Sequence, residues 1–480
     1  MDVGTIGPWV NGSYLTTASG PLVHVESPWD GTRVFEFRAA GEGVVSAAVD
    51  AAGCAFLAHR FAPVGVRARW CARIADAIEN AADRLVELVV VDIGKPRRAA
   101  RVEVSRTAAF CAACARAIQD LSGEVVPLDA AVAGEGLFGF ARRVPYGVVA
   151  AITPFNAPAN LLMQKVAPAL VAGNSLVVKP SVEGTRVALA LAECCQEAGV
   201  PDGLLNVVPG GAEEALTLAS HPRVDVVTVT GSTAAGEALA KAAGIKKFVG
   251  ELGGNSPNIV LADADIADAA KRIATSAFEA AGQQCISAQR IIVVSEVYEK
   301  FASAFVDATR RLVVGDPSSE ETDVGPVVNQ RSADRIMKAI DEAVLRGAGL
   351  LTQPDRVGCL IRPTIVFEAR RDSSIVRDEI FGPVAILLRA RDATEAIEIS
   401  NESAFGLQAA CFTRSIDAVM KMSNELNVGS IWINEGSRFR LDNYPFGGVG
   451  RSGHGREGVR YAIEEYSQWK FTGVRSVGGR

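Results

Sequence analysis

One cysteine, Cys285, occupies a position that suits a nucleophile. It follows Gly282, Gln283 and Gln284 and precedes an apolar run at 291–294 that predicts a strand. A thiol between a helix and a strand can face a cleft, where a base or the local field supplies the reactive thiolate. Most of the nine cysteines are expected to be small core residues, and Cys285 alone could be one of them.

Five further motifs hold residues that could act with this cysteine. Their sequences are TPFNAP (153–158), KPS (179–181), TGST (230–233), ELGGN (251–255) and EIFGP (379–383). In this order and spacing, over almost the whole chain, they resemble the aldehyde dehydrogenase superfamily. The resemblance implies oxidation of an aldehyde to a carboxylic acid with NAD or NADP.

The resemblance implies catalytic roles for three residues. Cys285 would attack the aldehyde, and Asn156 with the Cys285 backbone N–H would stabilise the resulting oxyanion, where one donor contributes about 10²–10³ in rate. After hydride transfer to the nicotinamide, Glu251 would activate water against the thioester. Glu251 stands before Leu252 and two glycines, which leaves it few local partners and favours a raised pKa.

Two alternatives to this activity stay open. A dehydrogenase that passes the acyl group to coenzyme A is disfavoured, because such members tend to lack the base at Glu251. A structural protein that has kept the fold and lost catalysis is also possible. It would be expected to lack Cys285, Glu251 or Asn156, and all three are present.

The turn after residue 229 is the better candidate for a dinucleotide site. An apolar strand ends at Thr230, and Gly231 and Ser232 lead into a helix whose first N–H groups could bind an anion, although Gly-Ser is also an ordinary helix cap. The match to G-x-G-x-x-G at 448–453 follows no strand that leads into a helix, so a structural or substrate-side loop is expected there. The further cofactor contacts expected in this superfamily are Lys179, Ser181, Glu379, Phe381, Thr153, Pro154 and Phe155.

The sequence leaves NAD and NADP about equally favoured. NAD-preferring members of the superfamily commonly carry Glu three residues after the lysine at 179. This chain has Val182 there, and Glu183 follows one place later. Because no carboxylate stands at that position to repel a 2′-phosphate, both coenzymes are expected to be possible.

Several polar residues near the predicted site indicate a small polar or anionic aldehyde. The stretches around Asn156, Cys285 and residues 437–447 resemble lactaldehyde, phosphonoacetaldehyde and non-phosphorylating glyceraldehyde-3-phosphate dehydrogenases. Arginine suits bidentate anion recognition, with an ordinary surface arginine as the alternative. The expected substrate contacts are Arg106, Arg290, Arg438, Arg440, Gln284 and Ser287. Some anion-using members have arginine where this chain has Gln284, so a semialdehyde or general aliphatic substrate stays an alternative.

The elements that must position these residues follow an α/β pattern. Apolar runs predict buried strands at 147–152, 175–179, 204–208, 224–229 and 246–250. Helical patterns lie between them near 158–171, 184–198, 211–219 and 233–243, and others precede them at 44–80, 82–93 and 102–121. A second series has strands near 258–261, 290–294, 363–366 and 384–388. Such alternation indicates parallel sheets covered on both faces.

A chain of 480 residues exceeds what one hydrophobic core usually supports, so several domains are expected. With the superfamily as guide, residues 1–123 and 142–252 would form the dinucleotide-binding domain and 253–436 the catalytic domain. Residues 124–141 and 467–480 would form a small β arm for assembly into a homodimer or homotetramer.

Composition points away from other partners and compartments. The net charge is −6 without a long Lys/Arg block, so no nucleic acid is expected. No run approaches the ~18 apolar residues of a membrane helix, and the N-terminus lacks the pattern of a secretory signal. The cysteines are irregularly spaced and the four histidines scattered, so neither a disulfide framework nor a metal site is expected. A cytoplasmic protein is the expectation.

Overall fold

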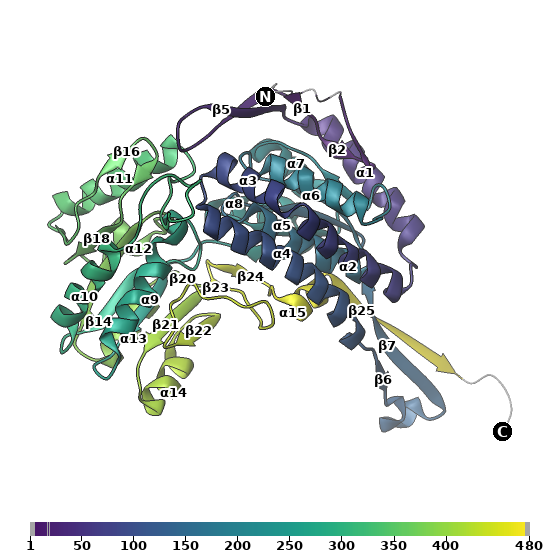
Figure 1. Cartoon of the computed structure of the whole chain (residues 1–480). Helices are drawn as coiled ribbons and strands as arrows, with labels where there is room; N and C mark the ends of the chain where they lie inside the picture. Colours follow the sequence, from purple (N-terminus) through teal and green to yellow (C-terminus); the bar gives the residue numbers. More distant parts are fainter. Residues whose placement is uncertain (1–4, 17, 19, 476–480) are drawn as a thin grey trace.

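The computed structural model describes residues 5–16, 18 and 20–475. The first four and the last five residues of the expected domains therefore lie outside the described part. Two large sheets organise the rest of the chain (Figure 1).

The first sheet has eight strands in the order β24-β12-β11-β8-β9-β10-β2-β3. The bounds are β2 Trp9–Val10, β3 Ser13–Tyr14, β8 Val148–Ile152, β9 Ser175–Lys179, β10 Leu205–Val207, β11 Val226–Thr230, β12 Lys247–Glu251 and β24 Gly453–His454. The five central strands, β12 to β10, pair in parallel, and antiparallel strands close both edges. The predicted parallel sheet is confirmed.

Helices cover both faces of this sheet. Residues of β8 alternate between two cores: Val149 and Ala151 pack in one, Val148 and Ala150 in the other. The first core includes α2 Val64–Asn80, α3 Ala82–Ile93, α4 Arg97–Ala117, α5 Pro158–Ala172, α6 Thr185–Glu197 and α15 Val459–Glu465. The second includes α1 Gly41–His59, α7 Ala212–Ser220 and α8 Thr233–Ala243. A strand buried on both faces needs continuous apolar residues, which is the pattern that the sequence showed.

The second sheet has seven strands in the order β15-β18-β19-β14-β13-β21-β22. The bounds are β13 Ser256–Val260, β14 Ala288–Val294, β15 Gly349–Leu350, β18 Thr364–Phe367, β19 Val384–Ala390, β21 Gln408–Phe412 and β22 Ser430–Ile433. Its helices are α9 Ile266–Phe278, α10 Tyr298–Arg310, α11 Gln330–Leu345, α12 Ser374–Arg377, α13 Ala393–Asn401 and α14 Ile416–Glu425.

Three smaller sheets complete the chain. They are β1 Thr5–Ile6 with β4 Leu22–Glu26 and β5 Arg33–Arg38, then β16 Arg356–Val357 with β17 Leu360–Ile361, and β20 Phe405–Gly406 with β23 Val449–Gly450. A separate arm holds β6 Glu124–Val126, β7 Leu137–Pro145 and β25 Ser467–Arg475. β25 pairs with β7 over its whole length, and the arm projects from the body (Figure 1). The expected β arm is thus present, and β7 continues beyond the expected boundary at residue 141.

Two expected helix bounds need correction. The helical pattern at 44–80 is interrupted after His59, and α2 starts at Val64 behind Pro63, because proline lacks the N–H that would continue α1. Helix α4 starts at Arg97, earlier than expected, directly after Pro96, since the fixed φ of proline suits a helix start. Helix α3, Ala82–Ile93, has the bounds that the sequence predicts.

Among the described residues, α1 is the one helix that length and composition would allow to cross a membrane. Its residues Val45, Ala48, Val49 and Ala52 are fully buried in the core beside β8. The helix therefore serves as a core helix of the first sheet.

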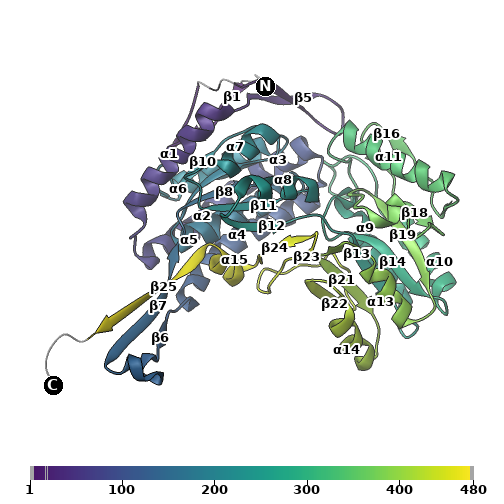
Figure 2. The same ribbon diagram turned by 180° about the vertical axis from the view of Figure 1, so that it is seen from behind.

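The chain returns to the first sheet after β22 (Figure 2). Strand β24 pairs antiparallel with β12 and places Gly453 opposite Glu251, while α15 packs in the same core as α5. The G-x-G-x-x-G match lies in this return segment, in the short strands β23 and β24. These strands are paired antiparallel to β20 and β12, so the match does not lie in a turn between a parallel strand and a helix, and its role as a structural or substrate-side loop stays a prediction.

Candidate active site

Cys285 lines a cavity of about 290 Å³. The lining comes from the α3–α4 hairpin, the start of α5, the loop before β14 and a segment of the return chain. It consists of Lys95, Ala99, Val102, Glu103, Arg106, Asn156, Ala157, Asn160, Leu161, Gln284, Cys285, Ile286, Arg438, Phe439 and Arg440. A larger cavity of about 730 Å³, between the N-terminal strands and α6, contains none of the predicted site residues.

The loop that carries Cys285 is held in an uncommon backbone conformation. Ala280, Ala281 and Gly282 have φ values of 53°, 57° and 66°, a left-handed region that alanine seldom adopts. The Ser287 hydroxyl donates to the Gly282 carbonyl oxygen (3.0 Å) and fastens the loop. Ser287 is not among the residues that line the cavity, so its expected substrate contact stays a prediction beside this role in shaping the loop.

The thiol of Cys285 is not ionised by its surroundings. Burial, with a smaller contribution from the negative charge of Glu379, raises its pKa to about 12, against the opposing charge of Arg440. A group that removes the proton is therefore required before the sulfur can attack.

Glu251 ends β12 and lies in the protein interior. Neither of its carboxylate oxygens has a hydrogen-bond partner within the described chain. Burial, reinforced by the negative charge of Glu457, raises the pKa of Glu251 well above its ordinary value. The surroundings of Glu251 therefore disfavour its charged form relative to an exposed carboxylate.

Two glycines bring the strand end next to the cysteine loop. A β-carbon on Gly254 would lie 1.9 Å from the carbonyl oxygen of Cys285, and one on Gly253 would lie 2.6 Å from the Glu379 carboxylate. Only glycine permits so close an approach of backbone to its neighbours. The motif ELGGN therefore joins the end of the first sheet to the loop that leads into the second.

Asn156 lies in the loop between β8 and α5 and shares the cavity with Cys285. Its side-chain amide donates to the carbonyl oxygen of Gln283 (2.9 Å), two residues ahead of the cysteine. The structure thus brings this predicted oxyanion donor to the nucleophile loop.

The predicted dinucleotide turn has the geometry of an anion site. Ser232 accepts a hydrogen bond from the backbone N–H of Ala235 and begins α8. A side chain at Gly231 would meet no atom within 4 Å, so the space before the helix is open. Helix N-termini carry free N–H groups and a partial positive charge, which fits the pyrophosphate of a dinucleotide.

The other predicted cofactor residues flank this turn and the cysteine loop. Lys179 ends β9, its ammonium donates to the Gly210 carbonyl oxygen (3.2 Å), and burial lowers its pKa to about 8. The Ser181 hydroxyl accepts from the Gly184 N–H (3.0 Å). The backbone N–H of Thr153 donates to the carbonyl oxygen of Lys179 (3.1 Å), so the loop through Pro154 leaves the sheet beside β9.

Glu379 contacts the ELGGN motif, and the two predicted aromatic residues contact each other. Glu379 accepts a hydrogen bond from the Gly254 N–H (2.9 Å), and burial raises its pKa to about 7. Phe155 and Phe381 contact edge to face, with ring centres 5.8 Å apart. These groups are available to hold a nicotinamide ribose, since dinucleotides bind beyond the carboxyl ends of parallel strands in α/β sheets.

Three of the four predicted arginines line the cavity, and each is paired with a carboxylate. Arg106 makes a bidentate contact with Asp442 (2.9 and 2.5 Å). Arg438 donates to Glu279 (2.6 Å). Arg440 donates to Glu457 (2.9 Å) and stacks on the ring of Phe446.

Arg290 does not belong to this cavity, which corrects its predicted role. It is 2% exposed and donates to the backbone carbonyls of Asn255, Ile399 and Ser400. The last two carbonyls are at the end of α13, where backbone acceptors lack helical partners. The guanidinium therefore serves as a structural cap and tie to the ELGGN motif, away from the substrate.

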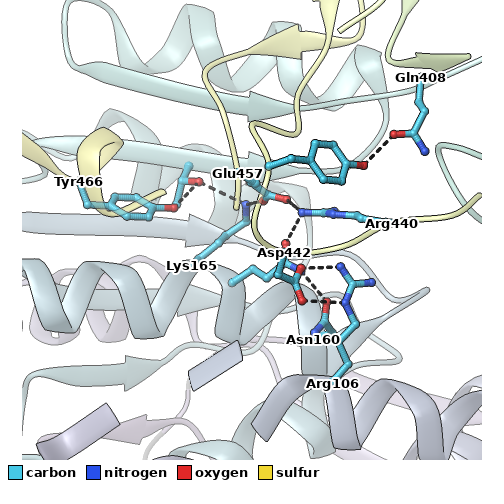
Figure 3. A network of polar contacts seen from close by, with 11 residues as sticks. Arg106, Asn160, Lys165, Gln408, Arg440, Asp442, Glu457 and Tyr466 are labelled. Atoms are coloured by element: carbon cyan, nitrogen blue, oxygen red, sulfur yellow. Dashed lines mark hydrogen bonds and ion pairs between the residues drawn. The ribbon is translucent and has the colours of Figure 1, made fainter. Parts of the chain in front are cut away.

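A buried ionic network behind the cavity was missed by sequence reasoning (Figure 3). Lys165, fully buried on α5, contacts Glu457 (3.2 Å) and Thr228 (3.3 Å). The hydroxyl of Tyr466 also donates to Thr228 (3.0 Å). Burial opposes ionisation of Glu457, but the charges of Lys165 and Arg440 outweigh it and lower its pKa. The available signal was a lysine inside an apolar helix, since buried charges are almost always paired.

Comparison with known proteins gives consistent matches. Residues 14–472 match the model described as the aldehyde dehydrogenase family. A 3-sulfolactaldehyde dehydrogenase of Priestia aryabhattai is 39% identical over 463 residues, 96% of either chain. A lactaldehyde dehydrogenase of Methanococcus maripaludis is 37% identical over 410 residues, covering 84% of this chain and 87% of the relative.

The structural comparison points the same way. The crystal structure of an NADP-dependent glyceraldehyde-3-phosphate dehydrogenase from Bacillus halodurans C-125, complexed with NADP, has a TM-score of 0.96 to this chain. The two sequences are 33% identical, and the match covers 98% of this chain and 99% of the other. The expected α/β fold of this superfamily is confirmed.

Proposed function

The chain belongs to the aldehyde dehydrogenase family, and we propose that its substrate is a three-carbon 2-hydroxyaldehyde with an anionic group on the third carbon. NAD or NADP accepts the hydride, and the product is the carboxylic acid. The observation that carries the proposal is the lining of the Cys285 cavity, where Arg106, Arg438 and Arg440 contribute cations.

The relatives support this substrate class through their names. Sulfolactaldehyde, lactaldehyde and glyceraldehyde 3-phosphate are three-carbon 2-hydroxyaldehydes, and the first and last carry an anionic group on carbon 3. A cavity of about 290 Å³ suits a molecule of that size, at the lower end of small-molecule sites.

The pairing of the arginines leaves donors for such an anion. Arg106 uses Nε and Nη2 for Asp442, and Arg438 uses Nη1 for Glu279. Within the described residues, Nη1 of Arg106 and Nη2 of Arg438 have no hydrogen-bond partner. Because the paired carboxylates hold each guanidinium in place, these free N–H groups would meet an anion with little loss of side-chain entropy.

The proposed reaction uses three residues of this chain. Cys285, after loss of its proton to a base, attacks the aldehyde carbon, and the Asn156 amide and Cys285 N–H donate to the oxyanion. A nicotinamide held at this site would accept the hydride from the adduct carbon, and loss of that hydride leaves a thioester on Cys285. Glu251 takes a proton from water, the hydroxide attacks the thioester, and the acid leaves as the thiol is restored.

The same carboxyl favours the free acid over transfer to coenzyme A. Glu251 lies beside the cysteine loop with both oxygens lacking a hydrogen-bond partner among the described residues. A base with a raised pKa binds a proton from water more readily than an ordinary carboxylate does. If coenzyme A accelerated turnover and an acyl thioester accumulated as product, this part of the proposal would be wrong.

We infer that NADP is accepted along with NAD. Val182 packs in the cluster with Phe35 and Phe37, and Glu183 accepts a hydrogen bond from Asn329 (3.2 Å). The carboxylate that follows the KPS motif is therefore occupied by a contact to the start of α11. The ratio of kcat/KM for the two coenzymes tests the inference, with a strict preference for NAD as the opposing result.

The substrate proposal is tested by comparing charged and neutral aldehydes. Wild-type enzyme should show a higher kcat/KM for 3-sulfolactaldehyde and glyceraldehyde 3-phosphate than for lactaldehyde, by about 10-fold or more for a charge-assisted contact. The double variant Arg106→Met/Asp442→Asn should lose that preference and leave lactaldehyde turnover nearly unchanged. Arg101→Met, which removes an exposed cation of α4 paired with Glu320, is the matched control.

An enzyme that prefers lactaldehyde, or a preference that survives the double variant, would contradict the anion site. Comparable turnover of an unbranched aliphatic aldehyde would support the general aldehyde dehydrogenase instead.

We propose that the enzyme is a cytoplasmic homodimer or homotetramer assembled through the β6-β7-β25 arm. The arm exposes the apolar side chains Val125, Val132, Phe138, Trp469, Phe471 and Val474. Contiguous exposed apolar surface on an edge of a sheet commonly marks an interface. Light scattering of wild type and Trp469→Asp/Phe471→Asp tests this: the variant should be monomeric, and a monomeric wild type would refute it. Fractionation of producing cells tests the location.

A further inference from the structure

A buried ion pair forms the floor of the Cys285 cavity. The ammonium of Lys95, in the turn between α3 and α4, lies 2.5 Å from the Glu103 carboxylate on α4. Both residues line the cavity, and they are 7% and 5% exposed. A buried ion pair costs desolvation that a structural contact alone seldom repays.

Glu103 determines where α5 begins. Its other carboxylate oxygen accepts hydrogen bonds from the backbone N–H groups of Ala159 (2.9 Å) and Asn160 (3.2 Å). These are first-turn donors, which need a partner from outside the helix. The residue before the helix, Ala157, supplies no side-chain cap, so Glu103 takes that place with a favourable charge at the helix N-terminus.

Lys95 fixes the residue that donates to the oxyanion. Besides Glu103, its ammonium donates to the carbonyl oxygen of Asn156 (3.0 Å). The Asn156 amide donates in turn to the Gln283 carbonyl (2.9 Å) on the cysteine loop. Asn156 is therefore held at its backbone by the cavity floor and at its side chain by the loop that carries the nucleophile.

We propose that Lys95 and Glu103 are a positioning pair for the oxyanion donor Asn156, an inference that rests on the proposed roles of Cys285 and Asn156. The pair sets the position of the 153–157 loop against α5 and so aims the Asn156 amide at the oxygen of the adduct. A preorganised donor stabilises developing charge without rearrangement during the reaction. A donor displaced by about 1 Å can cost about 10²-fold in rate.

Two reagents separate oxyanion stabilisation from thiol reactivity. 4-Nitrophenyl acetate acylates the Cys285 thiol through a tetrahedral oxyanion and releases 4-nitrophenolate. Iodoacetamide alkylates the same sulfur by displacement of iodide, without an oxyanion. Both reactions proceed without coenzyme, so their rates on the full-length enzyme report on the cavity once the rates of Cys285→Ala, which include the exposed Cys54, are subtracted.

Lys95→Met should slow acylation by about 10- to 100-fold and leave the alkylation rate within about twofold of wild type. With substrate aldehyde, kcat should fall more than KM rises. Arg101→Met, which removes an exposed cation from the same helical hairpin, should change neither rate. Because Lys95→Met leaves the buried Glu103 charge unpaired, the second variant is Lys95→Met/Glu103→Gln, which removes both charges and keeps an acceptor for the Ala159 N–H.

A double-mutant cycle tests whether Lys95 acts through Asn156. In the Asn156→Ala background, Lys95→Met should slow acylation no further, because the donor that it positions is gone. An equal loss in both backgrounds would overturn the proposal, as would unchanged acylation in the folded Lys95→Met/Glu103→Gln variant. If Lys95→Met raised KM for anionic aldehydes only, with acylation intact, Lys95 would be a substrate contact and the positioning role would be wrong.

Failure of the proposed function would look different. Acylation that persists in Cys285→Ala would remove the nucleophile itself, whatever the Lys95 variants do. If Cys285→Ala abolishes acylation and the Lys95 variants behave as wild type, only the positioning pair is refuted.

Discussion

Two carboxylates of one buried cluster, Glu251 and Glu457, differ in the partners that surround them. Glu251 has no hydrogen-bond donor on either oxygen among the described residues, and burial with the charge of Glu457 raises its pKa. Glu457 accepts from Lys165 and Arg440, whose charges outweigh burial and lower its pKa. Burial is similar at both sites, so the donors decide which carboxyl can exchange a proton and which serves as a fixed charge.

Glu379 lies between these extremes. It is also buried, and it has one backbone donor, the N–H of Gly254, together with the more distant charge of Arg335. Its pKa is raised to about 7. In this series the pKa is raised at the two carboxyls that accept no side-chain hydrogen bond from the described residues, and it is lowered at the one that accepts from two cationic side chains. This series predicts where a substitution changes catalysis and where it changes stability.

The largest effect is expected at the nucleophile, because no other side chain can replace its sulfur in the reaction. Cys285→Ala should reduce aldehyde oxidation by about 10⁴-fold or more, as for the loss of other catalytic nucleophiles, without a large change in the free energy of unfolding. Production of reduced nicotinamide measures it. Cys54→Ala, at an exposed cysteine, should keep full activity. Turnover that survives in Cys285→Ala would refute the mechanism.

Glu251→Gln should separate the two halves of the reaction. Loss of a general base costs about 10²–10⁴-fold, so steady-state turnover should fall while one equivalent of reduced nicotinamide still forms rapidly. The acyl-enzyme should then be detectable by mass spectrometry of the intact protein. Stability should hold or rise, since the change removes a buried carboxyl without partners. Unchanged steady-state turnover would place the base elsewhere.

Glu457→Gln should lower stability more than turnover, the reverse of Glu251→Gln. The free energy of unfolding should fall by about 3–5 kcal/mol, because Lys165 and Arg440 stay buried without their carboxylate. Loss of the negative charge should also lower the pKa of Glu251 and move the acidic limb of the pH–rate profile to lower pH. Denaturant unfolding measures the first effect.

The control is Glu464→Gln, which breaks an exposed pair with Arg460 on α15 and should cost under about 1 kcal/mol. Equal losses of unfolding free energy in Glu457→Gln and Glu464→Gln would contradict the role of Glu457 as a fixed buried charge.

The smallest effect concerns the pH dependence of stability. The pKa of Glu379 is raised from its ordinary 4.5 to about 7 in the folded protein, so its protonated form contributes stability fully below pH 4.5. That contribution is lost as the pH rises through 7, on the order of 3 kcal/mol in total. In Glu379→Gln, the free energy of unfolding should therefore decline less between pH 4.5 and 7 than it does in the wild type. Parallel stability curves for the two proteins would show that Glu379 has an ordinary pKa when folded.

Local sequence signals gave the elements of both sheets. Apolar runs such as 175–179 coincide with β9, Ser175–Lys179, because a parallel strand buried on both faces has no polar positions. The interruption at Pro63 was also readable from the sequence, since proline restricts helix continuation, but the long 44–80 pattern concealed it. Chain order and motif spacing were enough for the family.

The same signals could not distinguish Arg290 from Arg106. Arg106 lies in a helical pattern and Arg290 stands just before the apolar run at 291–294, and a one-dimensional pattern does not say which side chains turn toward a cavity. Arg290 caps α13, more than 100 residues later in the chain. Arg106 meets Asp442, 336 residues away. Contacts at such separations are decided by packing of the whole chain.

The sequence by itself determined the parallel α/β architecture, the identity of Cys285, Glu251 and Asn156 as candidates, and the class of reaction. The architecture follows from periodicity, and the candidates and the reaction class follow from the family resemblance that the short motifs carry, all of which are read along the chain. Only the tertiary structure decided which buried charges have hydrogen-bond donors or opposite charges beside them. The pKa of a carboxyl depends on donors and charges within a few ångströms, and those around Glu251, Glu379 and Glu457 come from segments far apart in the chain.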